Sequence, residues 1–185
     1  MRQSLVGRIF TVAALMLVFT SWAGSTGSRA ESIESEASFQ EPPCSGDEYR
    51  QFDFWIGDWS VTAGDRTAGQ NRITSILGGC VLLEQYKAAG GAYEGSSFNI
   101  YDQGVGEWHQ TWVDNQGLVL QLRGGVEDGQ MVLSGERQGQ DGTRITDRIA
   151  WTPRPDGTVR QLWQVSEDGG ETWRTVFDGT YTREE

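Results

Sequence analysis

The feature that most constrains this chain is a series of closely spaced glycine turns in its C-terminal half. Asn115-Gln116-Gly117 is followed by Asp-Gly pairs at 128–129, 141–142, 156–157, 168–169 and 178–179. Asp-Gly favours the positive φ angles that two-residue hairpin loops require. Between these turns, apolar and polar residues alternate over short runs, which is typical of antiparallel strands. The pattern predicts consecutive hairpins in which neighbours in sequence pair in space.

Strands are expected near residues 58–63, 70–77, 80–88, 94–102, 107–114, 118–124, 130–137, 143–152, 158–166 and 171–182. Only the segment Asp47–Phe54 has a helical pattern. An open sheet of about ten strands would leave two long unpaired edges, whereas closure into a barrel removes them. We therefore expect an all-β fold: an antiparallel up-and-down β-barrel with a short N-terminal helix. A barrel of this size encloses more space than side chains must fill, so a ligand cavity is expected.

The N-terminal segment 1–30 has the pattern of an export signal. Two arginines precede an apolar run over 9–19, and small residues suited to signal cleavage follow, the last of them Ala30. The run is short for a membrane span, and a single N-terminal anchor is the alternative. Residues 31–46 are polar and contain proline, which indicates a flexible leader before a folded domain at 47–185. We expect export to the periplasm or the medium, with no stable membrane insertion after cleavage.

The charge balance argues against nucleic acid as a partner. Fifteen Lys and Arg stand against 26 Asp and Glu, a net charge of −11; cleavage after Ala30 leaves 12 against 26, or −14. A negative field of this size repels phosphate backbones, and no basic stripe offsets it.

The two cysteines, Cys44 and Cys80, gain meaning from export, because oxidising compartments let disulfides persist. Paired, they close a loop of about 37 residues and stabilise the fold by about 4 kcal/mol in the chain-entropy model. Two free buried thiols are the alternative.

Several motifs carry a family resemblance. Gly57-Asp58-Trp59, after a short helical lead-in, resembles the Gly-x-Trp signature of the lipocalin and fatty-acid-binding (calycin) superfamily. A basic residue on the last strand often covers that Trp, and the resemblance points to Arg183. Further segments are similar to an exported bacterial calycin-like family known mainly as a domain of unknown function: 52–59, 78–84, 108–114 and 163–173. The resemblance spans nearly all of 47–185 and implies a fold without implying catalytic residues.

The segment from Ser166 to Trp173 also matches the Ser-x-Asp-x-Gly-x-Thr-Trp pattern of the Asp-box, which is found in sialidases and related propellers. This motif stabilises a hairpin turn through Ser and Asp side chains that bond the backbone, and it is not a catalytic element. A single copy cannot build a propeller. It therefore predicts a hairpin turn and carries little weight for sialidase activity.

Two strand faces are candidates for a pocket lining. Trp108, Gln110 and Trp112 share one face, and Gln161 and Trp163 share another. Turned inward, they would suit a small apolar or amphipathic molecule, with Trp providing contact area and Gln fixing orientation. Ordinary packing is the alternative. The leading hypothesis is an exported small-molecule binding protein.

Two carboxylates support a competing hypothesis. Asp147 and Glu84 each lie in phase with apolar residues of their strands. In an apolar cavity such a group is harder to ionise and can act as a general acid or base. This predicts a cofactor-independent isomerase, cyclase, hydratase or lyase. Ion pairing with Arg72, Arg123 or Arg160 is the ordinary alternative, and an interaction module with a filled interior is a third possibility.

No metal site and no cofactor are expected. His109 is the only histidine, which excludes zinc sites built from a pair of histidines. Haem ligation by this one residue competes with a solvent-facing imidazole beside Thr111.

Overall fold

The computed structural model describes residues 42–184. The predicted signal segment 1–30 and residues 31–41 of the predicted leader lie outside the described residues. Strand bounds are β1 (Gly57–Ala63), β2 (Arg66–Ile76), β3 (Val81–Ala88), β4 (Glu94–Asp102), β5 (Glu107–Asp114), β6 (Val119–Glu127), β7 (Gln130–Gln138), β8 (Arg144–Pro153), β9 (Val159–Ser166) and β10 (Arg174–Arg183). Three short 3-10 turns accompany them: η1 (Asp47–Arg50), η2 (Asp53–Trp55) and η3 (Leu77–Gly79).

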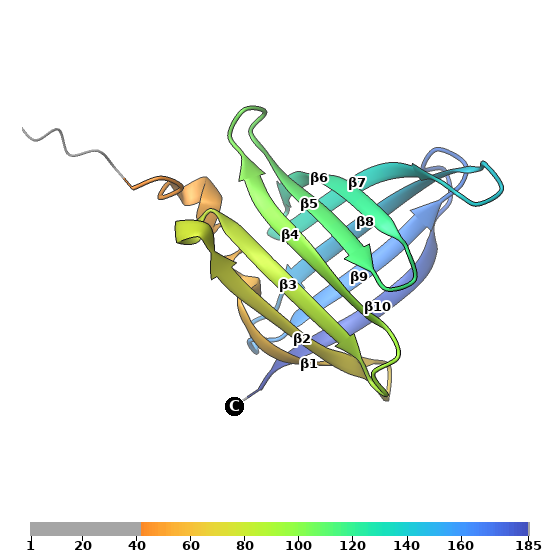
Figure 1. The fold of residues 1–185 in the computed structure, drawn as a ribbon, viewed down its shortest axis with the longest axis horizontal. Helices are drawn as coiled ribbons and strands as arrows, with labels where there is room; N and C mark the ends of the chain where they lie inside the picture. Colours follow the sequence, from red (N-terminus) through yellow and green to blue (C-terminus); the bar gives the residue numbers. More distant parts are fainter. Residues whose placement is uncertain (1–41, 185) are drawn as a thin grey trace, which may run out of the picture. The chain divides into compact units, whose positions relative to one another are not determined.

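Every strand pairs antiparallel with its neighbours in the sequence, and β1 pairs with β10 to close the barrel (Figure 1). The predicted all-β, up-and-down barrel of ten strands is confirmed. The predicted N-terminal helix is present as the two 3-10 turns η1 and η2.

Five of the six predicted glycine turns lie between strands, but only Asp128-Gly129 forms the predicted two-residue loop, and the others lie within longer loops. Asp128 and Gly129 both have positive φ angles, 47° and 77°, as a tight hairpin loop between β6 and β7 requires. The prediction of a turn at Asp178-Gly179 is wrong, because both residues lie inside β10 and pair with β9. Glycine is needed there for space: the ring of Phe177 packs where a Cβ on Gly179 would stand.

The hairpin between β9 and β10 has the hydrogen bonds predicted for an Asp-box turn. The hydroxyl of Ser166 accepts from the amide of Gly170 at 2.8 Å. A carboxylate oxygen of Asp168 accepts from the amide of Thr172 at 2.9 Å, and the indole of Trp173 donates to the Gly170 carbonyl at 3.1 Å. The motif closes a turn at the end of two strands.

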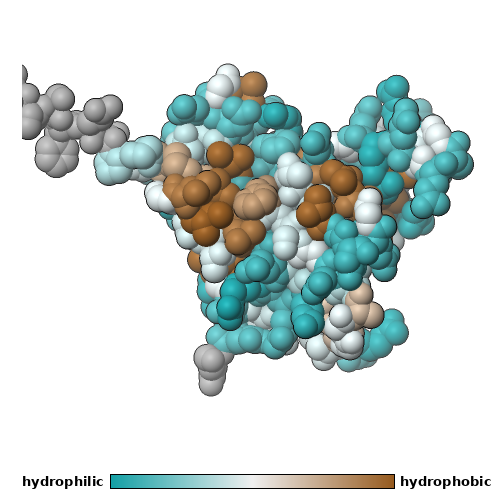
Figure 2. Space-filling view, viewed as in Figure 1, coloured by the Kyte–Doolittle hydropathy of each residue, from teal (hydrophilic) through white to brown (hydrophobic). Residues whose placement is uncertain are grey.

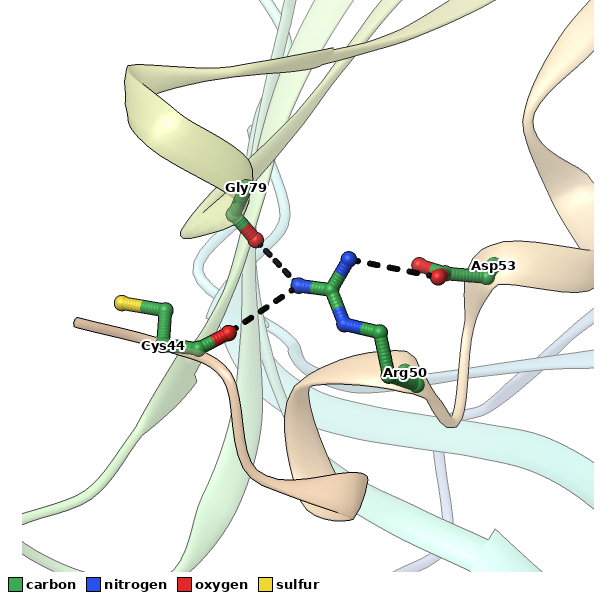
Figure 3. A network of polar contacts seen from close by, with 4 residues as sticks. All are labelled: Cys44, Arg50, Asp53 and Gly79. Carbon is green, nitrogen blue, oxygen red and sulfur yellow. Dashed lines mark hydrogen bonds and ion pairs between the residues drawn. The ribbon is translucent and has the colours of Figure 1, made fainter. Parts of the chain in front are cut away.

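A disulfide fastens the lead-in to the barrel. Cys44 and Cys80 are bonded, with their Cα atoms 5.1 Å apart, as predicted. Figure 3 shows Arg50 reinforcing the link. Its guanidinium donates to the carbonyls of Cys44 at 3.2 Å and Gly79 at 2.5 Å, and it pairs with Asp53 at 3.3 Å.

An aromatic cluster fills the end of the barrel next to this lead-in. Phe52 and Trp55 have no exposed surface, and their rings stack with centroids 4.9 Å apart. Barrel side chains surround them: Trp59, Trp108, Trp151 and Tyr181. Large rings therefore fill this end of the barrel interior.

Arg183 covers Trp59, as the family resemblance implied. The guanidinium carbon lies 4.3 Å from the centroid of the Trp59 ring, and Nη1 donates to the Ile56 carbonyl at 2.9 Å. Gly57 leaves room for this arrangement, since its φ is +147° and a Cβ there would collide with the guanidinium. The closed barrel and the covered Trp are compatible with a calycin-like fold.

The face shown in Figure 2 is mostly hydrophilic, with a larger apolar area over η3 and the neighbouring parts of β3 and β4 and a smaller, separate one to its right. Large apolar side chains that are exposed include Leu77 of η3 and Phe98 of β4. Within residues 42–184, no helix is both long and apolar enough to cross a membrane.

Candidate functional site

A cavity of about 280 Å³ lies inside the barrel, beyond the aromatic cluster. Its wall is formed by Glu84, Tyr86, Tyr93, Gln110, Trp112, Leu120, Ile149, Gln161, Trp163, Val176, Phe177 and Tyr181. Most of these are inward-facing residues from strands spread around the barrel. Aromatic rings therefore surround a space that is empty of protein atoms.

Four of the five predicted lining residues lie on this wall: Gln110, Trp112, Gln161 and Trp163. Trp108 shares the inward face of β5 but sits deeper, at 1% exposure within the aromatic cluster. Its indole donates to the side chain of Gln51 at 3.2 Å.

The ring of Trp112 packs against the backbone of β4 at Gly95. Gly95 faces it from β4, and a Cβ at that position would collide with the indole. Nearby, the phenol of Tyr93 donates to Asp114 at 2.9 Å. Trp112 and Tyr93 both line the cavity, and these contacts hold them in place.

Glu84 is the carboxyl group on the cavity wall, and it is 3% exposed. The amide of Asn71 donates to its Oε1 at 2.7 Å, and the hydroxyl of Ser97 donates to its Oε2 at 2.6 Å. No ion pair to Glu84 occurs in residues 42–184. The group is held by neutral donors only.

Further polar side chains extend this network across the interior. The amide of Gln110 donates to Asn99 Oδ1 at 2.8 Å, and the amide of Asn99 donates to Ser97 Oγ at 2.9 Å. On the other side of Glu84, the phenol of Tyr181 donates to Gln161. Two glutamines and one carboxyl of the wall are thus fixed in orientation by buried partners.

Burial raises the pKa of Glu84 to about 7, because desolvation of the charged form outweighs the hydrogen bonds from Ser97 and Asn71. Burial also raises the pKa of Tyr181 and of Tyr86, and the nearby Glu84 charge adds to both effects. Near neutral pH the carboxyl of Glu84 is therefore able to gain or lose a proton.

Asp147 differs from Glu84 because it has a cationic partner. Its carboxylate, 1% exposed, accepts from Arg137 at 2.7 Å and from the indole of Trp163 at 2.8 Å. Through this second bond Asp147 fixes the orientation of the Trp163 ring, which lines the cavity. The three arginines that the sequence suggested as partners for these carboxylates form ion pairs on the outer surface instead: Arg72 with Asp58, Arg123 with Asp102 and Arg160 with Asp178.

A second hollow of about 490 Å³ adjoins the cavity and shares Tyr93 and Trp163 with it. It is lined by the β5–β6 turn and by the end of β7, including Asp114 and Arg137. A ligand entering from this side would pass between polar groups before reaching the aromatic wall.

His109 lies on the outer face of β5, where its Nε2 is 3.0 Å from the hydroxyl of Thr111. Partial burial lowers the pKa of its imidazole. Among the described residues, no group of three or more His, Cys, Asp or Glu side chains is placed to hold a metal ion.

Sequence reasoning missed the phenols of the site and the two residues that hold Glu84, Asn71 and Ser97. Tyr86 alternates with Glu84 on β3, so its place on the wall follows from the strand period. Asn71 and Ser97 contact Glu84 from β2 and β4, and pairing of three adjacent strands brings them together. The two-residue alternation of a strand indicates which face each of these side chains lies on. It does not indicate the pairing register of the three strands, which brings the side chains together.

Comparison with protein-family models and with curated proteins finds no match for this chain.

Proposed function

We propose that this protein is an exported binding protein for a small, largely apolar molecule, held in the cavity of a calycin-like barrel. The observation that carries the proposal is the cavity wall, which combines large aromatic surfaces with a few fixed polar groups. Binding sites for small molecules have this composition: apolar surface supplies affinity, and a few polar groups set orientation.

Export is supported by the disulfide between Cys44 and Cys80. Such bonds persist in the periplasm and outside the cell, and reducing compartments remove them. The export-signal pattern of 1–30 points the same way.

The size of the cavity limits the ligand. Its volume of about 280 Å³ lies at the lower edge of the range of about 300–1,000 Å³ found for ligand pockets. A molecule of two or three fused or linked rings suits this space, and a long acyl chain does not fit without a change in the wall. Gln110 and Gln161 would bond a carbonyl or hydroxyl group of the ligand.

A matched pair of variants tests the proposal. Leu120 lies on the cavity wall, while its neighbour Val119 points outward and is 51% exposed. Leu120→Trp places an indole in the cavity, and Val119→Trp places the same indole on the outer surface. Binding of the neutral dye N-phenylnaphthylamine is followed by its fluorescence.

The dye is expected to bind the unmodified protein and Val119→Trp equally, and to bind Leu120→Trp at least about tenfold more weakly, because the added ring occupies its place. Far-ultraviolet circular dichroism checks that both variants remain folded. The proposal fails if neither the dye nor a panel of terpenoids and aromatics binds, or if both variants bind alike.

A second candidate function is acid–base catalysis by Glu84. The specific observation is a buried carboxyl on the cavity wall with a pKa of about 7 and no cationic partner in residues 42–184. A base with this pKa can abstract a proton α to a carbonyl and return it elsewhere on the same molecule. Asp147 is less suited, because it is paired with the cation of Arg137 at 2.7 Å and is not among the residues that line the cavity.

Proton exchange is the assay for this second function. In heavy water, the protein would speed deuterium uptake at the α position of a bicyclic ketone such as tetralone, measured by mass spectrometry. Glu84→Gln is expected to abolish the effect, and Glu94→Gln, at an exposed position, is expected to retain it. Equal rates with and without protein would exclude this activity toward such ketones.

A further inference from the structure

The cavity wall carries one acidic side chain and no basic one. None of the residues that line it is Lys, Arg or His, and its one carboxyl belongs to Glu84. Arg137, which lines the adjoining hollow, is already paired with Asp147 at 2.7 Å. Any positive charge placed beside Glu84 must therefore come from the ligand.

The carboxyl of Glu84 retains capacity for another donor. A carboxylate offers about four acceptor positions, and the structure fills two of them, one through Asn71 and one through Ser97. An unpaired buried carboxylate is costly, and a cation that enters with its own hydrogen-bond donors offsets that cost.

The rest of the wall is also suited to a cation. Trp112, Trp163, Tyr86 and Phe177 line the same cavity as Glu84. The faces of aromatic rings carry partial negative charge and attract ammonium groups, most strongly in sites shielded from water. The same rings offer apolar contact for the remainder of the molecule.

We propose that the cavity selects a ligand with a protonated amine attached to an apolar ring system, with the ammonium group against Glu84 and the rings against the aromatic wall. This inference rests on the proposed binding function and names its ligand class. Anionic ligands such as fatty acids are excluded, because their carboxylate would face Glu84 with no cation between them. The net charge of −11 favours the approach of cations over anions.

Binding is coupled to a proton. Below its pKa of about 7, Glu84 is protonated in the free protein. The ammonium group displaces that proton to solvent, so that one proton is released for each amine bound. Affinity for an amine therefore falls about tenfold for each pH unit below about 7 and is constant from about pH 7 up to the pKa of the amine itself.

Three naphthalene derivatives of nearly equal size provide the test: naphthylmethylamine, naphthylmethanol and naphthoic acid. Each competes with N-phenylnaphthylamine for the unmodified protein at about pH 7.5, where the amine is charged. The amine is expected to bind at least about tenfold more tightly than the alcohol, and the acid more weakly than either. Calorimetry in two buffers of different ionisation enthalpy counts the protons released below about pH 6.5.

Glu84→Gln keeps the shape of the side chain and an acceptor for Asn71, replaces the oxygen that faces Ser97 by an NH2 donor, and removes the charge. It is expected to lose the preference for the amine, so that the amine and the alcohol compete with the dye equally well. Glu94→Gln makes the same change of charge at an exposed position and is expected to keep that preference. An alcohol that binds as tightly as the amine, or a preference that survives in Glu84→Gln, overturns the inference and leaves the binding function standing. If the dye binds and no member of the series displaces it, this inference fails and the binding function stands.

Discussion

Substitution of Glu84 by glutamine is expected to change how the stability of the folded protein depends on pH. The pKa of this carboxyl is about 7 in the folded protein, against an ordinary value of 4.5. The difference corresponds to about 3 kcal/mol, at about 1.4 kcal/mol for each pKa unit. The amide introduced by Glu84→Gln would resemble the protonated acid, since it can accept from Asn71 and donate to Ser97.

The sign follows from proton binding. Between the unfolded and folded pKa values, the folded protein holds a proton that the unfolded chain has released, so stability falls as pH rises. Below about pH 4.5 the variant and the unmodified protein should be equally stable, and above about pH 7 the variant should be more stable by about 3 kcal/mol. Shifts of other groups are common to both proteins and cancel in the difference.

Urea unfolding followed by tryptophan fluorescence at a series of pH values measures this difference. At about pH 8 the midpoint of the variant should lie about 1–2 M urea above that of the unmodified protein, with an unchanged slope. Glu94→Gln should show no such trend. A difference between the Glu84 variant and the unmodified protein that stays constant from about pH 4.5 to about pH 8 would refute the reasoning that burial raises the pKa of this carboxyl.

Three further predictions concern the frame around the cavity. Replacing Cys44 and Cys80 by serine should lower the unfolding free energy in urea by about 4 kcal/mol, and a reducing agent should have no further effect on that variant. Arg183→Ala should lower the free energy of unfolding, measured by thermal unfolding, by about 1–2 kcal/mol, because the cation–π contact and the bonds to backbone carbonyls are lost. As a control, Arg174→Ala removes an exposed arginine of the same strand and should change stability by less than about 0.5 kcal/mol. Hydrogen bonds from Thr172 and Ser166 lower the pKa of Asp168, so Asp168→Ala should lower the melting temperature at neutral pH. The effect should become smaller as the pH falls below about 4, where Asp168 gains a proton in the unfolded chain and stays ionised in the folded protein.

The fold could be predicted because its determinants are local. Asp-Gly turns and the two-residue period require only neighbouring residues, and together they indicated the ten strands and their order. The disulfide and the cover of Trp59 by Arg183 were also within reach, the first from the export context and the second from a family resemblance. The turn wrongly expected at Asp178-Gly179 shows the limit of that reasoning. The sequence does not distinguish a glycine that makes room for a neighbouring ring from a glycine that forms a turn.

The site was harder to predict because it depends on depth and register. Trp108 and Trp112 share one face of β5, yet one fills the closed end and the other lines the cavity. Asp147 and Glu84 had the same sequence context, a carboxylate in phase with apolar neighbours. Pairing of β7 with β8 brings Arg137 to Asp147, whereas β2 and β4 bring only neutral donors to Glu84. Alternation identifies the face of a side chain and gives no information on its partner across the sheet.

The strand β4 gives a reason to assign the polar network a role beyond stability. Its alternation is inverted: Ser97 and Asn99 are buried, while Phe98 between them is 55% exposed. The network costs stability, because Glu84 is desolvated and the buried Oδ1 of Asn71 has no partner among the described residues. Apolar residues at these positions would remove both costs. Natural sequences depart from consistent patterning mainly at functional sites. An inverted strand that contributes a donor to a carboxyl on the wall of an aromatic cavity is such a departure, and it supports a ligand as the reason for the network.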